Sequence, residues 1–262
     1  MKNMALAPLV LAAACFGSFG ADSEIAERAA KGDAAALAQL IGMAQRRDAD
    51  AEFALGEMAY EGRGVPRSAS QAFRLFQRAA KRGHAGAQNA LGFFHQHGIA
   101  TKADLPEALR WYRAAAERGE ARAQVNLGSL YRDGSGVAKD ESSALAWFRK
   151  AAAQGSPEAL YNIAYTLEHA TGSSGQDQTL ARATYAQAAD AGLALADHRL
   201  ARMLEEGLGG SRDLVAALAR YRQAGENGLA KARVDVARTL ALLAVTVDEE
   251  SPTPDLAKAG DY

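Results

Sequence analysis

Glycines recur along this sequence at an almost constant interval. Five of them, separated by 36, 36, 37 and 36 residues, are Gly83, Gly119, Gly155, Gly192 and Gly228. A second series with the same intervals consists of residues that favour the start of a helix: Ser68, Asp104, Asp140, Asp177 and Asp213. Two independent markers that keep one register indicate tandem copies of a single unit. Such a chain is expected to fold as a repeat protein, without one central core.

Each unit is predicted to contain two helices joined by a short loop. In residues 123–155 the first helix precedes the loop Gly134-Ser135-Gly136-Val137, and the second helix begins at Asp140 and ends at Gly155. The position after the last turn of a helix favours a left-handed backbone, which glycine adopts without strain. The regular glycines are therefore predicted to mark the ends of the second helices.

This pattern closely resembles the Sel-one-like repeat (SLR) family, a relative of the tetratricopeptide solenoids. The matching motifs are Leu127-Gly128 in the first helix, Gly134-x-Gly136-Val137 in the loop, and Trp111 and Trp147, each followed by an Ala-Ala pair, in the second helix. The resemblance covers about residues 34–243 and implies an all-α, right-handed α-solenoid of helix-turn-helix repeats with a 36-residue period. The two tryptophans, with Tyr185 and Tyr221, are expected to fill the space between repeats.

The repeats predict how the chain is divided. Residues 21–47 are expected to form an N-terminal cap, in which Arg47 stands at the glycine position. Five repeats follow at about residues 51–83, 87–119, 123–155, 159–192 and 196–228, and a last helix, 230–247, is expected to cap the C-terminal end. In the second repeat Ala100 replaces a loop glycine. Residues 248–262, with two prolines and scattered charge, are predicted to be a disordered tail.

The first 20 residues have a different character. Lys2 precedes an apolar run, and small residues stand before Ala21, which predicts a secretory signal peptide and a periplasmic or secreted protein. An apolar N-terminal helix docked on the solenoid is the alternative. The single cysteine, Cys15, excludes an intramolecular disulfide, and its preceding residues loosely resemble a bacterial lipoprotein box, so lipidation there is a second alternative. No other stretch approaches 18 consecutive apolar residues, so no transmembrane span is expected.

Composition and motifs argue against several functional classes. The formal net charge of -1 gives no basic excess, which disfavours a nucleic-acid partner. His95 and His97 are two residues apart, so on a helix they face different directions and are a poor metal pair. We find no nucleophile or phosphate-binding motif and expect no cofactor. An enzyme, such as the cell-wall hydrolase or β-lactamase activity proposed for cysteine-rich relatives of the family, is the alternative class.

A non-catalytic role in protein binding is the favoured prediction. In the fold that the resemblance implies, the first helices line the concave face, and a row of nominally exposed positions carries several aromatic and charged residues, which are Phe53, Glu57, Phe93, Tyr161, Tyr165 and Arg202. Aromatic anchors are favoured at protein interfaces. The alternative is that these rings pack on neighbouring helices. The resemblance suggests an envelope scaffold, adaptor or inhibitor, with regulators of sensor systems, assembly factors and immunity proteins all remaining open.

Overall fold

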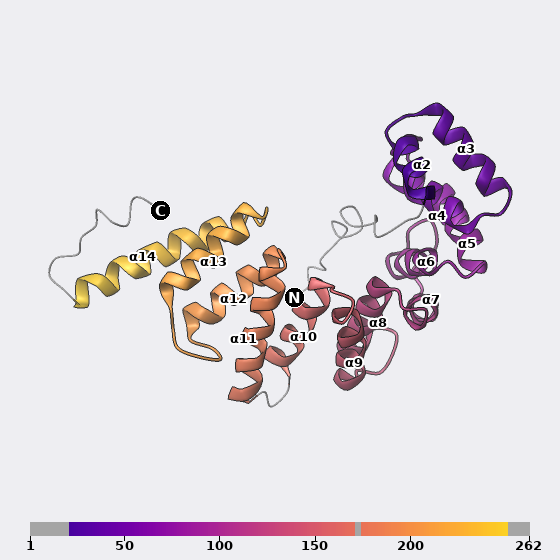
Figure 1. Ribbon diagram of the computed structural model, residues 1–262. Helices are drawn as coiled ribbons and strands as arrows, with labels where there is room; N and C mark the ends of the chain where they lie inside the picture. The colour runs from indigo at the N-terminus through magenta and orange to yellow at the C-terminus, as the bar shows by residue number, and fades with distance from the viewer. Residues whose placement is uncertain (1–20, 171–173, 251–262) are drawn as a thin grey trace. The chain divides into compact units, whose positions relative to one another are not determined.

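The computed structural model describes residues 21–170 and 174–250 (Figure 1). This part of the chain contains 13 helices and no strand, which confirms the predicted all-α solenoid of repeats of about 36 residues. The predicted signal peptide with Cys15, and residues 251–262 of the predicted tail, lie outside the described residues.

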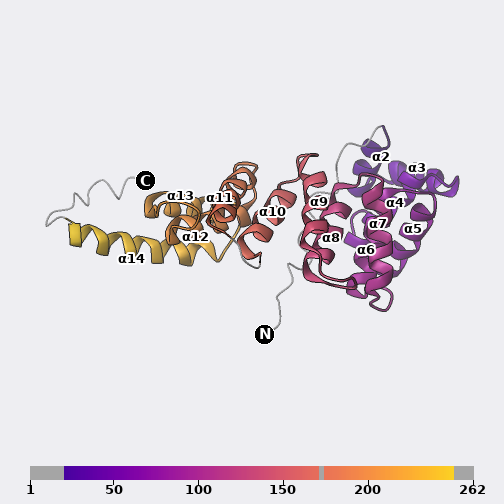
Figure 2. The ribbon, with the colours of Figure 1, turned by 90° about the horizontal axis from the view of Figure 1, so that it is seen from below.

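The helices belong to two compact units. The first unit holds residues 21–130 and 135–138, with helices α2 (Ala21–Ala30), α3 (Ala34–Gln45), α4 (Ala49–Glu61), α5 (Ala69–Lys81), α6 (Ala85–His97), α7 (Leu105–Glu117) and most of α8 (Ala121–Asp133). The second unit holds the end of α8 with α9 (Glu141–Ala152), α10 (Pro157–His169), α11 (Gly175–Asp190), α12 (Ala194–Glu206), α13 (Leu214–Glu226) and α14 (Ala232–Glu250). Within a unit, the two helices of a repeat pack side by side, as α4 does with α5 and α12 with α13 (Figures 1 and 2).

The first helices of the five repeats are α4, α6, α8, α10 and α12, and the second helices are α5, α7, α9, α11 and α13. Four second helices begin at the predicted residue, whose side chain accepts a hydrogen bond from the amide three residues later. These four residues are Ser68, Asp104, Asp140 and Asp213. Such caps satisfy amides that have no partner within the helix.

The prediction that Asp177 begins a helix is wrong by one turn. Helix α11 starts at Gly175, and Ser174 is its N-cap. The Ser174 hydroxyl accepts the amide of Asp177 at 3.2 Å, and the Asp177 carboxylate accepts the amide of Ser174 at 2.8 Å. This reciprocal pair satisfies two amides at once, which favours the earlier start.

The regular glycines end the second helices as predicted. Their φ angles lie between 85° and 92° at Gly83, Gly119, Gly155, Gly192 and Gly228. Two residues with side chains adopt a similar left-handed backbone where the repeat pattern calls for glycine: Arg47, with φ 69°, and Ala100, with φ 56°. The repeat therefore keeps this turn even at residues for which a left-handed backbone is strained.

The aromatic side chains buried in the second helices differ from the predicted set. They lie at Phe76, Tyr112, Phe148, Tyr185 and Tyr221, and each is at most 1% exposed. Tyr185 and Tyr221 are thus correctly predicted, whereas Trp111 and Trp147 precede the buried position by one residue and are only half-buried. Trp147 lies instead beside the Lys150 ammonium, 3.8 Å from the ring centroid. One residue along a helix turns a side chain by about 100°, so adjacent positions cannot share the buried face.

Glycines in the first helices make room for these buried rings. A Cβ atom added to Gly56 would lie 2.5 Å from the ring of Phe76, and one added to Gly92 would lie 2.6 Å from the ring of Tyr112. Neither distance is compatible with normal packing. The Leu-Gly motif of the sequence is therefore explained by a ring that packs directly on the backbone of its neighbour.

The C-terminal helix is longer than predicted. We expected the cap helix to end at residue 247 and a tail to begin at 248, but α14 continues to Glu250. No glycine or proline interrupts it before Pro252.

Ala100→Gly should stabilise the protein and Gly155→Ala should destabilise it. The left-handed backbone at Ala100 costs about 1–2 kcal/mol, of which the greater chain entropy of glycine returns part, so we expect a net gain of about 0.5–1 kcal/mol. A methyl group at Gly155 would meet no atom within 4 Å. The stability lost in Gly155→Ala, about 1 kcal/mol, should therefore come from backbone strain alone. Free energies of unfolding from denaturant titration would test both, and shifts of the same sign would contradict the assignment.

Candidate protein-binding face

In the first unit, Phe53 and Glu57 of the predicted binding row are buried, and Phe93 is partly exposed. Phe53 is 8% exposed and stacks on the ring of His84, with centroids 4.3 Å apart, while Glu57 is 9% exposed. Phe53 also lies against Phe76, 5.7 Å away. The prediction that Phe53 and Glu57 form an open surface is therefore wrong, because a side chain at the start of the next first helix covers the ring. Phe93 is half-buried and contacts His97, with centroids 4.3 Å apart.

The corresponding positions of the second unit remain accessible. Tyr161 and Tyr165 lie on α10, partly exposed, with stacked rings 6.2 Å apart. Arg202 is exposed on α12 and pairs with Glu206 at 3.0 Å. Three of the six predicted binding residues therefore lie in the second unit with surface available to a partner.

Two guanidinium groups flank the ring of Tyr165. The Arg132 guanidinium carbon lies 5.2 Å from the ring centroid, and that of Arg199 lies 5.3 Å from it. The ring also stacks on His169, with centroids 4.1 Å apart. Cation–π contacts favour these arrangements and hold the tyrosine in one orientation. The prediction from sequence found the tyrosine but missed Arg132 and Arg199.

In most repeats, the residue at the position equivalent to Arg132 accepts a hydrogen bond from the buried tyrosine. The buried tyrosine hydroxyls of three second helices each donate to an acceptor near the end of the preceding first helix. The pairs are Tyr112 with Gln96 at 2.7 Å, Tyr185 with Glu168 at 2.7 Å, and Tyr221 with Glu205 at 2.9 Å. A buried hydroxyl without a hydrogen-bond partner destabilises the fold, so each buried tyrosine requires an acceptor nearby.

The third repeat departs from this pairing. Its buried ring is Phe148, which has no hydroxyl, and Arg132 stands where those three repeats place the acceptor; the first repeat likewise has a phenylalanine, Phe76, with Tyr60 at this position. The Arg132 guanidinium lies 5.9 Å from the Phe148 centroid and donates to the side-chain oxygen of Asn162 on α10 at 2.5 Å. Comparing these two positions across repeats is the sequence signal that could have identified Arg132. The exchange brings a cation to the tyrosines of α10.

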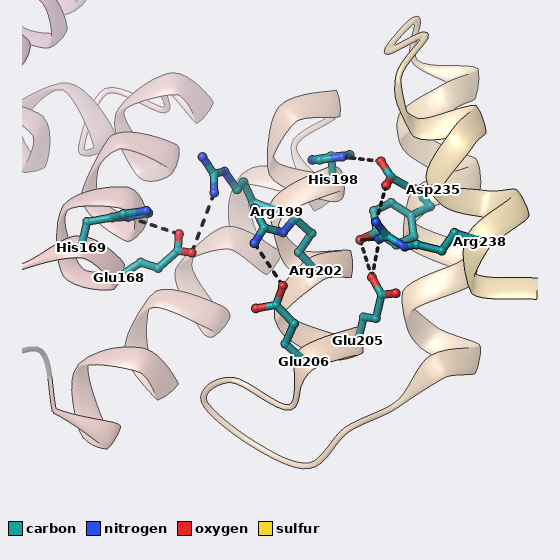
Figure 3. A network of polar contacts seen from close by, with 10 residues as sticks. Glu168, His169, His198, Arg199, Arg202, Glu205, Glu206, Asp235 and Arg238 are labelled. Carbon is teal, nitrogen blue, oxygen red and sulfur yellow. Dashed lines mark hydrogen bonds and ion pairs between the residues drawn. The ribbon is translucent and has the colours of Figure 1, made fainter. Parts of the chain in front are cut away.

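A hydrogen bond and an ion pair connect α12 with α14 (Figure 3). His198 lies 2.8 Å from the Asp235 carboxylate, and Arg238 pairs with Asp235 at 3.2 Å and with Glu205 at 2.7 Å. They border a groove of about 550 Å³, which is lined by His198, Arg202, Glu205, Glu206, Arg212, Lys231, Asp235, Arg238 and Leu242. Charged and hydrogen-bonding side chains therefore dominate this part of the surface.

The basic groups of this surface influence one another. Burial lowers the pKa of His198, and the positive charges of Lys231 and Arg199 lower it further against the opposing hydrogen bond to Asp235. Burial also lowers the pKa of Lys231, and the charges of Arg199 and Arg202 act in the same direction, whereas Asp235 opposes them. The basic side chains are thus close enough to repel one another.

The described residues offer no alternative centre for metal chemistry. They contain no group of three or more His, Cys, Asp or Glu side chains placed to hold a metal ion. His95 packs edge-on against the ring of Phe73 with centroids 5.6 Å apart, and His97 is exposed.

Between residues 21 and 170 and between 174 and 250, no helix has both the length and the apolar character to cross a membrane.

Two solved structures are similar to this chain over most of its length. A structure of c5321, a protective antigen present in uropathogenic Escherichia coli strains, is 29% identical with a TM-score of 0.75 over 83% of this chain and 48% of that chain. This chain therefore spans about half the length of the E. coli protein. A Sel1 repeat protein from Oxalobacter formigenes is 27% identical with a TM-score of 0.74 over 82% of this chain and 86% of that one. A search of curated proteins finds no match.

A third relative shows the fold alone. It is a putative Sel1 repeat protein from Klebsiella pneumoniae, 19% identical with a TM-score of 0.51 over 77% of this chain and 97% of that one. The family model for the Sel1 repeat matches five times in succession, at residues 49–84, 85–120, 121–156, 157–193 and 194–229. The chain belongs to the Sel1 repeat family.

Proposed function

We propose that this protein is a non-catalytic scaffold, adaptor or inhibitor that binds a protein partner through the second unit, on the surface formed by α10, α12 and α14. Sel1 repeat proteins generally mediate protein–protein interactions, and no catalytic family matches this chain. The observation that carries the proposal is Tyr165, a partly exposed ring held between Arg132 and Arg199. Tyrosine and arginine are among the residue types that most often dominate interface energies.

The tyrosines of this surface are also held in place before any partner binds. The ring of Tyr161 packs against both Tyr165 and the buried Tyr185, with centroids 6.2 and 5.5 Å apart. Side chains that are already ordered lose little conformational entropy on binding, which favours affinity. Phe53 is covered by His84 and Phe93 packs on His97, whereas Tyr165 lies between two guanidinium groups, which favours the second unit.

Crosslinking at single positions would test this surface directly. A benzophenone-bearing phenylalanine in place of Tyr165, and separately in place of Arg202, should trap the same protein in the cells that normally produce this chain. Arg149, exposed on the second helix α9, is the matched control position and should trap nothing comparable. Trapping at Arg149 without trapping at the other two positions would contradict the proposed surface.

Tyr165→Ala should then weaken the affinity for the trapped protein by about 2 kcal/mol or more, which is about 30-fold. The melting temperature of the variant should stay close to that of the parent, because the ring is only partly buried. Loss of binding that follows from unfolding alone would instead favour a purely structural role for the ring.

We further propose that the protein acts in the bacterial envelope after export. This rests on the basic start, the apolar run and the small residues before Ala21. Protein purified from its natural source should begin near Ala21, or carry a lipid at Cys15, when its N-terminus is read by mass spectrometry. An intact Met1 on protein in the cytoplasm would contradict both.

A further inference from the structure

Two basic side chains of the proposed binding surface lack a close counter-charge. Arg199 is only 24% exposed, yet the nearest carboxylate that pairs with it, that of Glu168, lies 3.9 Å away (Figure 3). Lys231, just before α14, is exposed, and within the described residues it forms no ion pair. Asp235 partly offsets the charge of Lys231, and Glu168 and Tyr161 partly offset that of Arg199, but in the described parts of the chain neither cation has a close ion pair, so both can bind a further carboxylate.

The acidic groups nearby are already engaged. Glu206 pairs with Arg202, Asp235 pairs with both His198 and Arg238, and Glu205 accepts from Tyr221 and Arg238. Arg199 lies over the ring of Tyr165, 5.3 Å from its centroid, and its charge acts on the nearby Lys231. Burial is the main cause that lowers the pKa of Lys231, and repulsion from Arg199 and Arg202 lowers it further; an added negative group would offset that repulsion.

We infer that the partner presents an acidic peptide segment, whose side-chain carboxylates accept hydrogen bonds from Arg199 and Lys231 while a neighbouring residue packs on Tyr165. This inference rests on the proposed function and names the chemistry of its partner. Arginine matches the geometry of a carboxylate with two parallel donors, and lysine supplies a mobile point charge. Opposite charges across an interface favour both the rate of encounter and the correct register.

The surroundings favour carboxylates over a nucleic acid or another dense polyanion. Four acidic residues border the cluster: Glu168, Glu205, Glu206 and Asp235. A nucleic-acid backbone holds a phosphate beside them at every step, whereas the flexible side chains of an acidic peptide can turn away those carboxylates that find no basic partner. The net charge of the whole protein, -1, supplies no long-range attraction for a polyanion.

A fluorescein-labelled hexaglutamate peptide is a suitable probe, with hexaglutamine as the neutral control and a single-stranded 12-nucleotide DNA as the polyphosphate. Fluorescence anisotropy with the purified protein at low salt should show tighter binding to hexaglutamate than to either control. Added salt should weaken the binding, because the contact is ionic.

Matched double variants make the test specific. Arg199→Gln with Lys231→Gln should weaken hexaglutamate binding at least tenfold, and Arg199→Lys with Lys231→Arg should restore part of it. Arg149→Gln with Lys150→Gln removes the same charge from α9 and should change binding less than twofold. Equal weakening by both glutamine pairs would overturn the inference, as would equal affinity for hexaglutamine or tighter binding of the DNA.

The hexaglutamate experiment and the crosslinking experiment can fail independently of each other. If Tyr165 traps a partner but the wild-type protein does not bind hexaglutamate, the partner is not acidic and the binding surface stands. If hexaglutamate binds through Arg199 and Lys231 but neither Tyr165 nor Arg202 traps a protein, the acidic site stands and the proposed binding surface is wrong.

Discussion

The first two repeats depend on one recurring contact, in which an aromatic ring of the second helix packs on a glycine of the first helix. Phe76 lies on Gly56 in the first repeat and Tyr112 lies on Gly92 in the second, each so close that a Cβ atom on the glycine would overlap the ring. Burial of such a ring contributes about 1.5–3 kcal/mol. A repeat with only two helices has little else to bury, so the ring and its neighbouring repeats together decide whether it folds.

The proposed binding surface arises where the same repeated position takes on a different role. Most repeats use the position near the end of the first helix to accept a hydrogen bond from the buried tyrosine, as Glu168 does for Tyr185. With Phe148 as the buried ring, that requirement disappears, and Arg132 extends to Asn162 and Tyr165 of the next repeat. A small departure from the repeat thus gives a polar side chain new contacts in the next repeat.

Much of the fold could be predicted from the sequence, because its strongest signals are local. A left-handed glycine or a helix-capping aspartate acts on its own backbone, so regular spacing fixes the helix ends regardless of distant contacts. The assignment of the buried ring failed at Trp147, because two adjacent aromatic residues are equally apolar and only the direction of each side chain separates them. Asp177 was misplaced because Ser174, one turn earlier, could also begin the helix.

The candidate site was less predictable, because exposure depends on neighbouring repeats. Phe53 and Tyr161 occupy equivalent positions, yet His84 covers the first ring while the second stays partly exposed. Arg199 and Lys231 carry no sequence motif, and their significance comes from which carboxylates the fold leaves available to them. These are properties of tertiary packing that periodicity alone does not encode.

The most direct test of the central contact compares two adjacent substitutions by their free energies of unfolding. Phe148→Ala removes a ring that is 0% exposed and should cost about 3–5 kcal/mol, whereas Trp147→Ala, which removes a larger but half-buried ring, should cost about 1 kcal/mol. Phe148→Leu, a smaller change, should fall between them if Phe148→Ala does not fold. A greater loss from Trp147→Ala than from Phe148→Ala would contradict the assignment of the buried ring and the packing built on it.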